Sequence, residues 1–477
     1  MYDPEQPIYD EEVVSSIKVH IGIDEHPKSW LHTIYYALQI TLVDFTPFIW
    51  SASYVAIAGL PETVIPVMIT ACFIAMGIGT LMQTTIGNRL PIVQGPSGAL
   101  VASMGNVTKF YGMPAMWGSV IVGGLIEALI GATRVMSRIR KFLPPTVLGA
   151  VVASIGFVAA KLAITWTFSR PEPAFLILAL LAFLLALFLK FKCKGVLSQG
   201  FMLLSVVAVG VIGGSVLKVM DWQSVADAPW IALPKLFPFK DFEGVGNGKA
   251  IAVIGAAVLG GFTGYIGSMF ESIGDYAATS AACNVTFKVK HIDRGIMSEG
   301  LACAIGGLFG ALPTTSYSQN IGVVAATGVA SRRVTRVAAV FFLLYGLCPK
   351  LGTFLAAIPR PVIGAVFLIT ASMIMFSGLD LIASAERTQR NTMIAGTTLG
   401  ASVMIPYFVT TGGAAWAKTL PAFLNMFVNS NIFIAVVFGV VLNLLLNHLF
   451  KEKVKTPSGS EAASEKAESQ ESQESGG

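Results

Sequence analysis

Two acidic residues, Glu271 and Asp275, stand four positions apart in a stretch of mostly small and apolar residues. On a helix this spacing places both carboxylates on one face. Two carboxylates that close cannot both stay ionised away from water, so one of them is expected to hold a proton near neutral pH. The alternative is that the helix ends there and both acids are hydrated, which the small and apolar residues that continue through position 281 disfavour.

A pair of amides, Gln319 and Asn320, forms the second polar feature. Residues 313–318 before them read as extended chain, so a helix is expected to begin at Gln319. A helix that begins inside a membrane presents free N–H groups and the positive end of its dipole there. Ser97 and Gly98 form a similar helix start. Two such ends facing each other would make a neutral-to-anionic polar site, unless the amides only hydrogen-bond neighbouring helices.

Three more acids lie within apolar stretches, where an ionisable residue is costly and is by default a functional candidate. Glu299 is interpreted either as a second proton-sensitive group near the site or as a capped helix start. Asp44, beside Phe45, either lines the site or pairs with a core residue. Glu127 is interpreted as structural.

Nothing in the sequence indicates catalysis or a bound cofactor. The five histidines lie in loops, in tails or near the ends of apolar stretches, and the five cysteines are scattered without metal-ligand spacing. No nucleotide-binding loop, nucleophile elbow or zinc-protease motif occurs. We therefore expect no enzymatic activity, no cofactor, no metal centre and no ATP-driven step.

The elements that position these residues must be membrane helices. Only 12% of the 477 residues are charged and 54% are hydrophobic, whereas a soluble domain carries about 25% charged residues. So few charges cannot cover a water-facing surface, and lipid requires that backbone polar groups be satisfied internally. Long apolar runs favour helices over a β-barrel. The net charge of +5 lies in loops and indicates membrane topology rather than affinity for nucleic acid.

Fourteen apolar stretches approach the length of about 20 residues that crosses a membrane. The third and tenth are short and begin with polar, Pro-containing segments. With the N-terminus in the cytoplasm, the inner segments hold 19 Lys and Arg and the outer segments hold 10, which follows the positive-inside rule. We therefore predict an all-α polytopic membrane protein with both termini in the cytoplasm. The stretches are 33–57, 63–84, 90–108, 115–133, 146–166, 173–190, 200–218, 251–272, 296–311, 317–330, 334–355, 361–379, 391–411 and 430–449.

The sequence also repeats itself weakly. Residues 143–151 align with residues 358–366, and residues 90–91 match residues 312–313. Both matches are seven spans apart, and an odd offset turns the second copy upside down in the membrane. Inverted repeats are the usual build of secondary transporters, and a pair of interrupted spans at matching positions marks the binding site.

Three motifs resemble those of the nucleobase–ascorbate transporters. Residues 319–327 (Gln, Asn, any residue, Gly, four variable residues, Thr) resemble the signature of that family. Residues 271–279 resemble its span-eight motif and residues 94–99 its span-three motif. The motifs occur in order at the corresponding spans, and the similarity runs over spans one to fourteen.

The resemblance implies a fold of seven plus seven spans in an inverted repeat, with short antiparallel strands in spans three and ten. It also implies an elevator-like movement of a core domain against a gate domain, which forms the homodimer. The expected organisation is a cytoplasmic tail at 1–30, core segments at 31–133 and 251–355, gate segments at 134–218 and 356–449, an outer loop at 219–250 and a disordered cytoplasmic tail at 450–477.

The same resemblance implies how a base would be held. Glu271 would accept hydrogen bonds from ring N–H groups, and Gln319 would make a bidentate contact to the other edge of the base. Main-chain N–H groups near Gly98 and Ser318 would bind exocyclic oxygens. The remaining expected substrate contacts are Ser97, Asn320 and Phe45.

The resemblance further implies that Asp275 and Glu299, together with Glu271, support proton coupling. Gln at position 319 and Asp at position 275 are similar to the xanthine and urate members, whereas uracil members carry Glu and His there. Gly98 stands where many members have Phe, so either the site is wider in this chain or the ring that stacks on the base comes from elsewhere, Phe45 or Tyr317. Many members also carry His at position 40, where this chain has Ile.

We therefore expect a proton-coupled symporter for a purine of the xanthine or urate type, in a bacterial inner membrane or a plasma membrane. The open alternatives are a carrier of the same family for uracil, another base or ascorbate, a sulfate-type anion transporter of the same fold, and a channel or sensor. An acid at position 271 disfavours an anionic ligand unless it is protonated.

Overall fold

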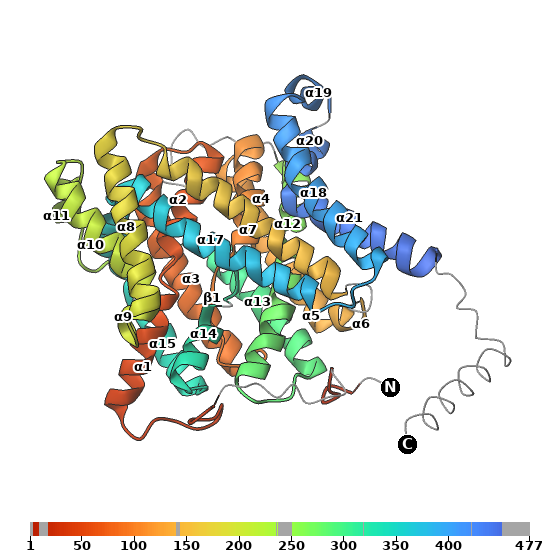
Figure 1. Ribbon diagram of the computed structural model, residues 1–477, viewed down its shortest axis with the longest axis horizontal. Coiled ribbons are helices and arrows are strands. Elements are labelled where there is room, and N and C mark those ends of the chain that lie inside the picture. Colours follow the sequence, from red (N-terminus) through yellow and green to blue (C-terminus); the bar gives the residue numbers. More distant parts are fainter. Residues whose placement is uncertain are drawn as a thin grey trace, which may run out of the picture.

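The computed structural model describes residues 3–8, 18–139, 144–234, 236, 250–317, 319–420 and 422–450, and their regular structure is almost entirely helical, as the composition predicts (Figure 1). The first half contains α1 Trp30–Val43, α2 Pro47–Ala58, η1 Glu62–Val64, α3 Ile65–Thr85, β1 Gln94–Pro96, α4 Gly98–Tyr111, α5 Met113–Ala132, α6 Val135–Ile139, α7 Pro145–Thr167, α8 Pro173–Lys192, α9 Val196–Gln199, α10 Phe201–Val216 and α11 Trp222–Asp227. The second half contains α12 Ala250–Ala282, α13 Val289–Leu308, β2 Thr314–Ser316, α14 Gln319–Thr327, α15 Arg332–Gly346, α16 Pro349–Ala356, α17 Arg360–Ala383, α18 Gln389–Thr411, α19 Ala414–Thr419, α20 Ala422–Val428, α21 Asn431–Asn443 and the π-helix η4 Leu444–Leu449.

Several helices begin where the sequence supplies a start signal. Ser29, Ser97, Thr388 and Ser430 precede α1, α4, α18 and α21, and each side chain accepts a hydrogen bond from the N–H three residues further on. Proline occupies the first turn of α2, α7, α8 and α16, where its missing N–H has no helical partner to lose.

Four predicted spans are broken. The first span consists of α1 and α2, which are separated at residues 44–46. The third and tenth consist of a short strand followed by a short helix, as predicted. The eleventh, expected as one helix over 334–355, is instead α15 and α16, which meet at 80° around Pro349. The prediction of a continuous eleventh span was therefore wrong.

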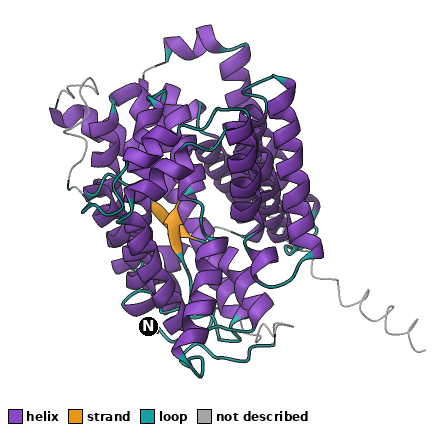
Figure 2. Ribbon diagram, turned by 90° about the vertical axis from the view of Figure 1, so that its left-hand side faces the viewer, coloured by secondary structure: helices purple, strands orange, loops and turns teal. Residues whose placement is uncertain are grey.

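The two strands pair antiparallel in the middle of the bundle, with helices around them (Figure 2). Gln94 lies opposite Ser316, and all residues of both strands are buried. Gly95 permits this packing, because a Cβ there would lie 2.4 Å from Cζ of Tyr317. The Tyr317 hydroxyl in turn lies 2.6 Å from Thr46 Oγ1, which joins this crossing to the break between α1 and α2.

Glycines bring two helix pairs into close contact. On α5, a Cβ at Gly124 would lie 2.6 Å from the carbonyl oxygen of Gly300 on α13. On α7, a Cβ at Gly149 would lie 2.5 Å from the carbonyl oxygen of Gly378 on α17. Small residues that let backbones approach this closely are typical of packing between membrane helices.

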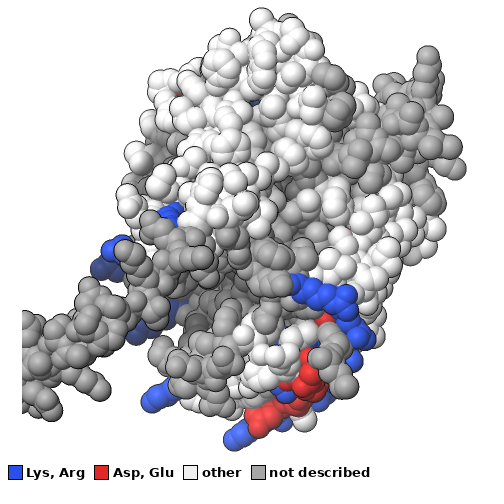
Figure 3. Space-filling model, turned by 90° about the vertical axis from the view of Figure 1, so that its right-hand side faces the viewer, with Lys and Arg blue, Asp and Glu red and all other residues white. Residues whose placement is uncertain are grey.

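Seven helical segments among the described residues, with α1 and α2 taken together as one, are long and apolar enough to cross a membrane, and the bent pair of α15 and α16 would add an eighth. α10 and α21 are apolar but shorter. The helix lengths alone do not establish how many times the chain crosses the membrane. The fourteen spans and the inverted repeat therefore remain predictions. On the face in Figure 3 the charged side chains gather toward one end of the molecule, and the rest of the described surface there is uncharged.

The described parts of the N-terminal segment pack against this charged end. Pro7 pairs with Lys288 in an isolated bridge, and Glu5 forms ion pairs with Lys288 (2.8 Å) and Lys290 (2.5 Å). These two lysines lower the pKa of Glu5 to about 2. Most of the predicted outer loop after residue 234 and the predicted tail at 451–477 lie outside the described residues.

Candidate functional site

Glu299 lies at the centre of a buried hydrogen-bond network, in the middle of α13 and not at a helix start. Its carboxylate accepts hydrogen bonds from Ser272 (2.7 and 2.9 Å to the two oxygens), Tyr276 (2.9 Å) and Thr315 (3.3 Å). With its amide oriented to satisfy both ends, Gln94 of β1 also donates to it at 3.2 Å. α12, α13 and both strands therefore meet at one fully buried carboxyl group.

Asp275 joins this network through a single hydroxyl. Ser316 Oγ of β2 lies 2.8 Å from Asp275 Oδ2 and 3.1 Å from Ser272 Oγ. Because Ser272 contacts Glu299, two hydroxyls bridge the carboxyl groups of Asp275 and Glu299. Ser316 owes its position to strand pairing, since it lies opposite Gln94.

Glu271 and Asp275 line one cavity, in agreement with the face that their spacing predicts. This Glu271 cavity has a volume of about 320 Å³ and lies between α12 and α14 on one side and α7 and α17 on the other. Glu271 is half-buried, and its Oε2 has no hydrogen-bond partner among the described residues. Asp380 of α17 and Ser384, which directly follows α17, also line the cavity and are exposed, so it opens toward the last turn of α17.

Gln319 begins α14, as predicted, and lines a second cavity. This Gln319 cavity has a volume of about 350 Å³ and lies between α1 and α14 on one side and α8, α9, α10 and α17 on the other. It shares Ile321, Ile374 and Ser377 with the Glu271 cavity, so the two are adjacent. Among its described lining residues, Lys190 alone carries a charge.

Two other expected contacts, Asn320 and Ser97, line neither cavity in the described part of the chain. The Asn320 amide donates to the carbonyl of Pro91 at 2.5 Å, which ties α14 to the segment before β1. Ser97 caps α4 by accepting from the N–H of Leu100 at 3.3 Å. Ser318 falls outside the described residues. Contacts of these three with a substrate remain predictions.

The aromatic ring next to Gly98 belongs to Trp50 of α2. A Cβ on Gly98 would lie 2.6 Å from Cη2 of Trp50, and Trp50 packs edge-on against Phe367 of α17 at 5.3 Å. Phe45 packs against Phe73 at 4.9 Å and lines neither cavity. A stacking role for Phe45 remains a prediction, and Trp50 is a ring that the sequence did not single out.

Asp44 and Glu127 are buried acids of a different kind. Both are 0% exposed, and neither carboxylate oxygen of either residue has a hydrogen-bond partner among the described residues. Asp44 lies at the break between α1 and α2, and no core residue pairs with it in the described part of the chain. An ionised carboxylate without donors is costly to bury, so both groups are expected to be neutral in this conformation.

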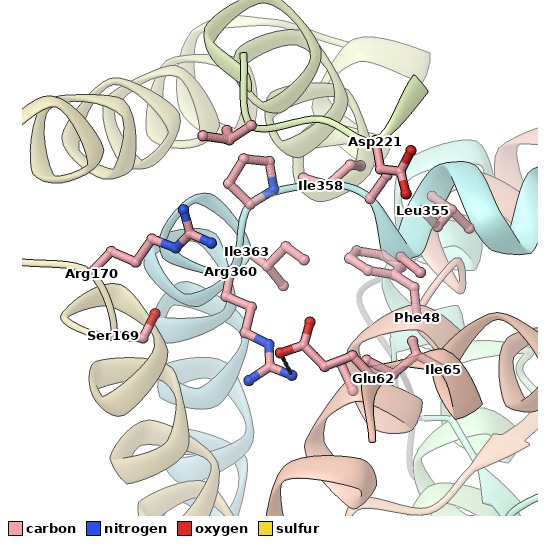
Figure 4. A pocket seen from close by; sticks show the side chains of 15 residues that line it. Phe48, Glu62, Ile65, Ser169, Arg170, Asp221, Leu355, Ile358, Arg360 and Ile363 are labelled. Atoms are coloured by element: carbon pink, nitrogen blue, oxygen red, sulfur yellow. Dashed lines mark ion pairs between the residues drawn. The ribbon is translucent and has the colours of Figure 1, made fainter. Parts of the chain in front are cut away.

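A third cavity, of about 380 Å³, lies at the other end of α17 (Figure 4). Arg360, the first residue of α17, and Glu62 of η1 point toward each other there and form an ion pair at 2.8 Å. Arg170 and Asp221 lie on the rim of the same cavity. This ion pair joins α17 to the turn between α2 and α3.

Residues 31–411 match the sequence model of a family described as the Permease family. The chain belongs to the nucleobase–ascorbate transporter family. It is therefore an integral, multi-pass membrane protein and a transporter, not an enzyme.

Curated relatives of this family match most of the chain. The uric acid permease PucK of Bacillus subtilis is 30% identical over 360 residues, which cover 71% of this chain and 80% of that protein. The xanthine permease XanQ of Escherichia coli is 28% identical over 427 residues, which cover 83% and 87%. The uric acid transporter UacT of Escherichia coli is 28% identical over 396 residues, which cover 80% and 78%.

Solved structures show the same fold at low sequence identity. The murine anion transporter Slc26a9 in its inward-facing state aligns with a TM-score of 0.60 at 12% identity, over 90% of this chain and 70% of that one. The transmembrane domain of the cyanobacterial bicarbonate transporter BicA aligns with a TM-score of 0.54 at 13% identity, over 89% and 100%. This family member therefore shares its architecture with anion carriers.

Several polar residues of this nucleobase–ascorbate transporter family member were missed by the sequence analysis. Ser272 lies inside the span-eight motif and Ser316 lies just before the signature. Their positions in or beside these motifs could have identified both as candidate site residues. Asp380 was missed because span twelve was predicted to end at residue 379, whereas α17 continues to Ala383. Lys190, the last residue of the predicted sixth span, was counted only as one of the 19 inner Lys and Arg. No group of three His, Cys, Asp or Glu side chains in the described part of the permease is arranged to hold a metal ion.

Proposed function

We propose that this protein is a proton-coupled symporter for a purine nucleobase of the xanthine or urate type. The observation that carries the proposal is the bridged pair of buried carboxyl groups, Asp275 and Glu299, next to a cavity that also exposes Glu271. The relatives named as uric acid and xanthine permeases support the substrate class.

The substrate part of the proposal places a base at the junction of the two cavities. Glu271 has a carboxylate oxygen without a partner among the described residues, and it would accept from ring N–H groups. The side chain of Gln319 offers both a donor and an acceptor and would bind the opposite edge of the base. Main-chain N–H groups at the start of α4 and α14 would bind its oxygens.

The proton part of the proposal follows from the two bridging hydroxyls. When Asp275 carries the proton, it can donate to Ser316, while Ser316 donates to Ser272 and Ser272 to Glu299. Each hydroxyl then gives up one proton and receives one. The net result is that the Asp275 O–H bond breaks and an O–H bond forms on Glu299. A proton could thereby move between a group on the cavity wall and a group buried behind the strands.

The conformational part of the proposal assigns α1–α5 and α12–α16 to a core domain and α7–α10 and α17–α21 to a gate domain. Both cavities would then lie between core and gate and open toward the end of the molecule that carries the N-terminal segment, which we assign to the cytoplasm. At the other end the Arg360–Glu62 ion pair would close the same boundary. We further propose fourteen spans in an inverted repeat, elevator-like movement of the core, and a homodimer through the gate.

The deciding experiment is uptake of radiolabelled xanthine and urate, with competition by hypoxanthine, guanine, uracil, ascorbate and sulfate. We expect the oxopurines to compete best and an uncoupler to abolish accumulation. Glu271→Gln should abolish transport, and Gln319→Glu should shift the preference among bases. If sulfate or uracil competes best, or if Glu271→Ala transports purines normally, the proposal is wrong.

A second candidate, an anion carrier of the same fold, is favoured by the architecture shared with BicA and Slc26a9. Half-buried Glu271 opposes it, because a carboxylate repels a small inorganic anion unless it is protonated, and sulfate has no ring N–H group to donate to it, whereas a purine keeps such groups even as a monoanion. Uptake of labelled sulfate or bicarbonate by the purified protein in vesicles, without competition by purines, would establish this alternative.

A further inference from the structure

Lys190 occupies an unusual position for a cation in a membrane protein. It lies in the last turn of α8, is half-buried, and lines the Gln319 cavity. Its ammonium group lies 5.2 Å from the centroid of the Phe201 ring, which lines the same cavity. No carboxylate pairs with it among the ion pairs of the described residues.

A simpler role as a membrane-surface anchor is available to its neighbour. Lys192 lies on the same turn and is exposed, and a cation there also complements the negative end of the α8 dipole. Lys190 differs because it faces a cavity and has lost part of its hydration there. A half-buried charge is costly unless a partner of opposite sign approaches it, and the cavity is the available place for that partner.

The other groups around the cavity match a flat, polar, aromatic anion. Gln319 and Gln199 supply amides from opposite walls, and Gln199 Oε1 is buried without a hydrogen-bond partner among the described residues. Phe201 and Met202 supply apolar surface. The volume of about 350 Å³ is within the range of about 300–1,000 Å³ that small-molecule sites occupy.

The other ionisable groups near Lys190 do not line the Gln319 cavity. Asp44 follows Val43, a lining residue, but is fully buried at the break after α1. Asp380 of α17 lines the adjacent Glu271 cavity with Asp275. α9, α10 and α14 carry no ionisable side chain. The boundary between the proposed core and gate domains thus has an acidic part around Glu271 and a basic part, Lys190, around Gln319.

We propose that Lys190 makes the Gln319 cavity a site for the monoanionic form of an oxopurine, so that this protein prefers purines that are deprotonated at neutral pH. This inference rests on the proposed function and narrows its substrate class. The ammonium group pairs with charge delocalised over the ring nitrogens and oxygens of the anion, while the two amides contact its edges. Urate, which is largely an anion at neutral pH, is the preferred ligand, and hypoxanthine, which is neutral, is the weaker one.

The test is equilibrium binding to the purified full-length protein, with labelled urate, xanthine and hypoxanthine. Replacing a charge-assisted contact by a neutral one weakens binding about ten- to a hundredfold, so Lys190→Gln should weaken urate binding by that factor. Hypoxanthine binding should change less than about threefold. Lys190→Arg should retain the urate preference, and Lys192→Gln is the matched control that should leave all three ligands unaffected.

The wild-type protein provides a second test that needs no variant. Xanthine loses a proton as the pH rises through neutrality, so its affinity should rise relative to that of hypoxanthine measured at the same pH. Because both affinities are measured at the same pH, effects of protein titration that are common to both ligands cancel in this ratio. Equal weakening of urate and hypoxanthine in Lys190→Gln, or a constant ratio in the wild type, overturns the inference and leaves the proposed function intact. Failure of the wild type to bind any of the three purines overturns both.

Discussion

Replacing Ser316 by alanine removes the single hydroxyl that connects the two halves of the carboxyl network. Ser316 Oγ contacts Asp275 Oδ2 at 2.8 Å and Ser272 Oγ at 3.1 Å. The backbone pairing opposite Gln94 involves main-chain atoms and stays intact. Because the side chain is 1% exposed, water has little access to replace the lost hydroxyl.

The size of the effect follows from the contact that is lost. A hydrogen bond to a charged group contributes about 1.5–3 kcal/mol, which corresponds to a factor of about 10 to 150. We expect Ser316→Ala to lower proton-driven purine uptake by that factor. Exchange of labelled for unlabelled purine, which needs no net proton movement, should fall much less.

Proteoliposomes separate these two activities, because an imposed pH gradient drives uptake and its absence leaves only exchange. Ser280→Ala is the matched control, since Ser280 is also buried but donates to a carbonyl of its own helix, that of Tyr276, at 2.8 Å. In an Asp275→Asn background, Ser316→Ala should have little further effect, because the two residues act through one bond. Normal gradient-driven uptake by Ser316→Ala, or fully additive effects in the double variant, would refute the proton pathway.

Three further predictions concern groups outside this network. Glu62→Gln removes an exposed ion pair with Arg360 worth at most about 1 kcal/mol, so uptake should change less than about fivefold, and the change should vanish at high salt. Burial, with Lys290 and Lys288 nearby, lowers the pKa of His291 to about 4, below about 6.5 in an unfolded chain. Between these two values the unfolded chain binds more protons than the folded protein. The contribution of neutral His291 to the free energy of unfolding is therefore complete above about pH 6.5 and is lost as the pH falls toward 4. His291→Asn should flatten this part of the pH profile of the unfolding temperature, whereas exposed His26→Asn should not. Asp44→Asn should fold and transport normally if Asp44 is neutral, and a strongly lowered unfolding temperature would show that it is ionised.

The membrane class and the interrupted spans could be predicted because they depend on local sequence. Apolar runs, Pro and Gly placement and helix-start residues act over a few positions, and the strands at 94–96 and 314–316 fell where the sequence was neither apolar enough for a span nor polar enough for a loop. The bend at Pro349 was missed although Gly346 and Pro349 mark a helix boundary there, because apolar residues continue on both sides of it. Periodicity and hydropathy do not register a change of direction within an apolar run.

The site was predicted where it depends on one motif and missed where it depends on contacts between motifs. Glu271 and Asp275 share a helix face, so their spacing alone places both on one cavity. The partners of Glu299 come from three other elements, α12, β1 and β2, and only the register of the β1–β2 pair brings Ser316 to Asp275. The position of Lys190 also could not be predicted from local sequence. As a residue at the end of an apolar run it is indistinguishable from Lys192, and only the packing of α8 against α10 and α17 turns one of them toward the cavity. A substrate preference that rests on Lys190 is therefore a property of tertiary packing, and a relative that keeps all three family motifs but lacks this cation should bind the neutral base at least as well as the anion.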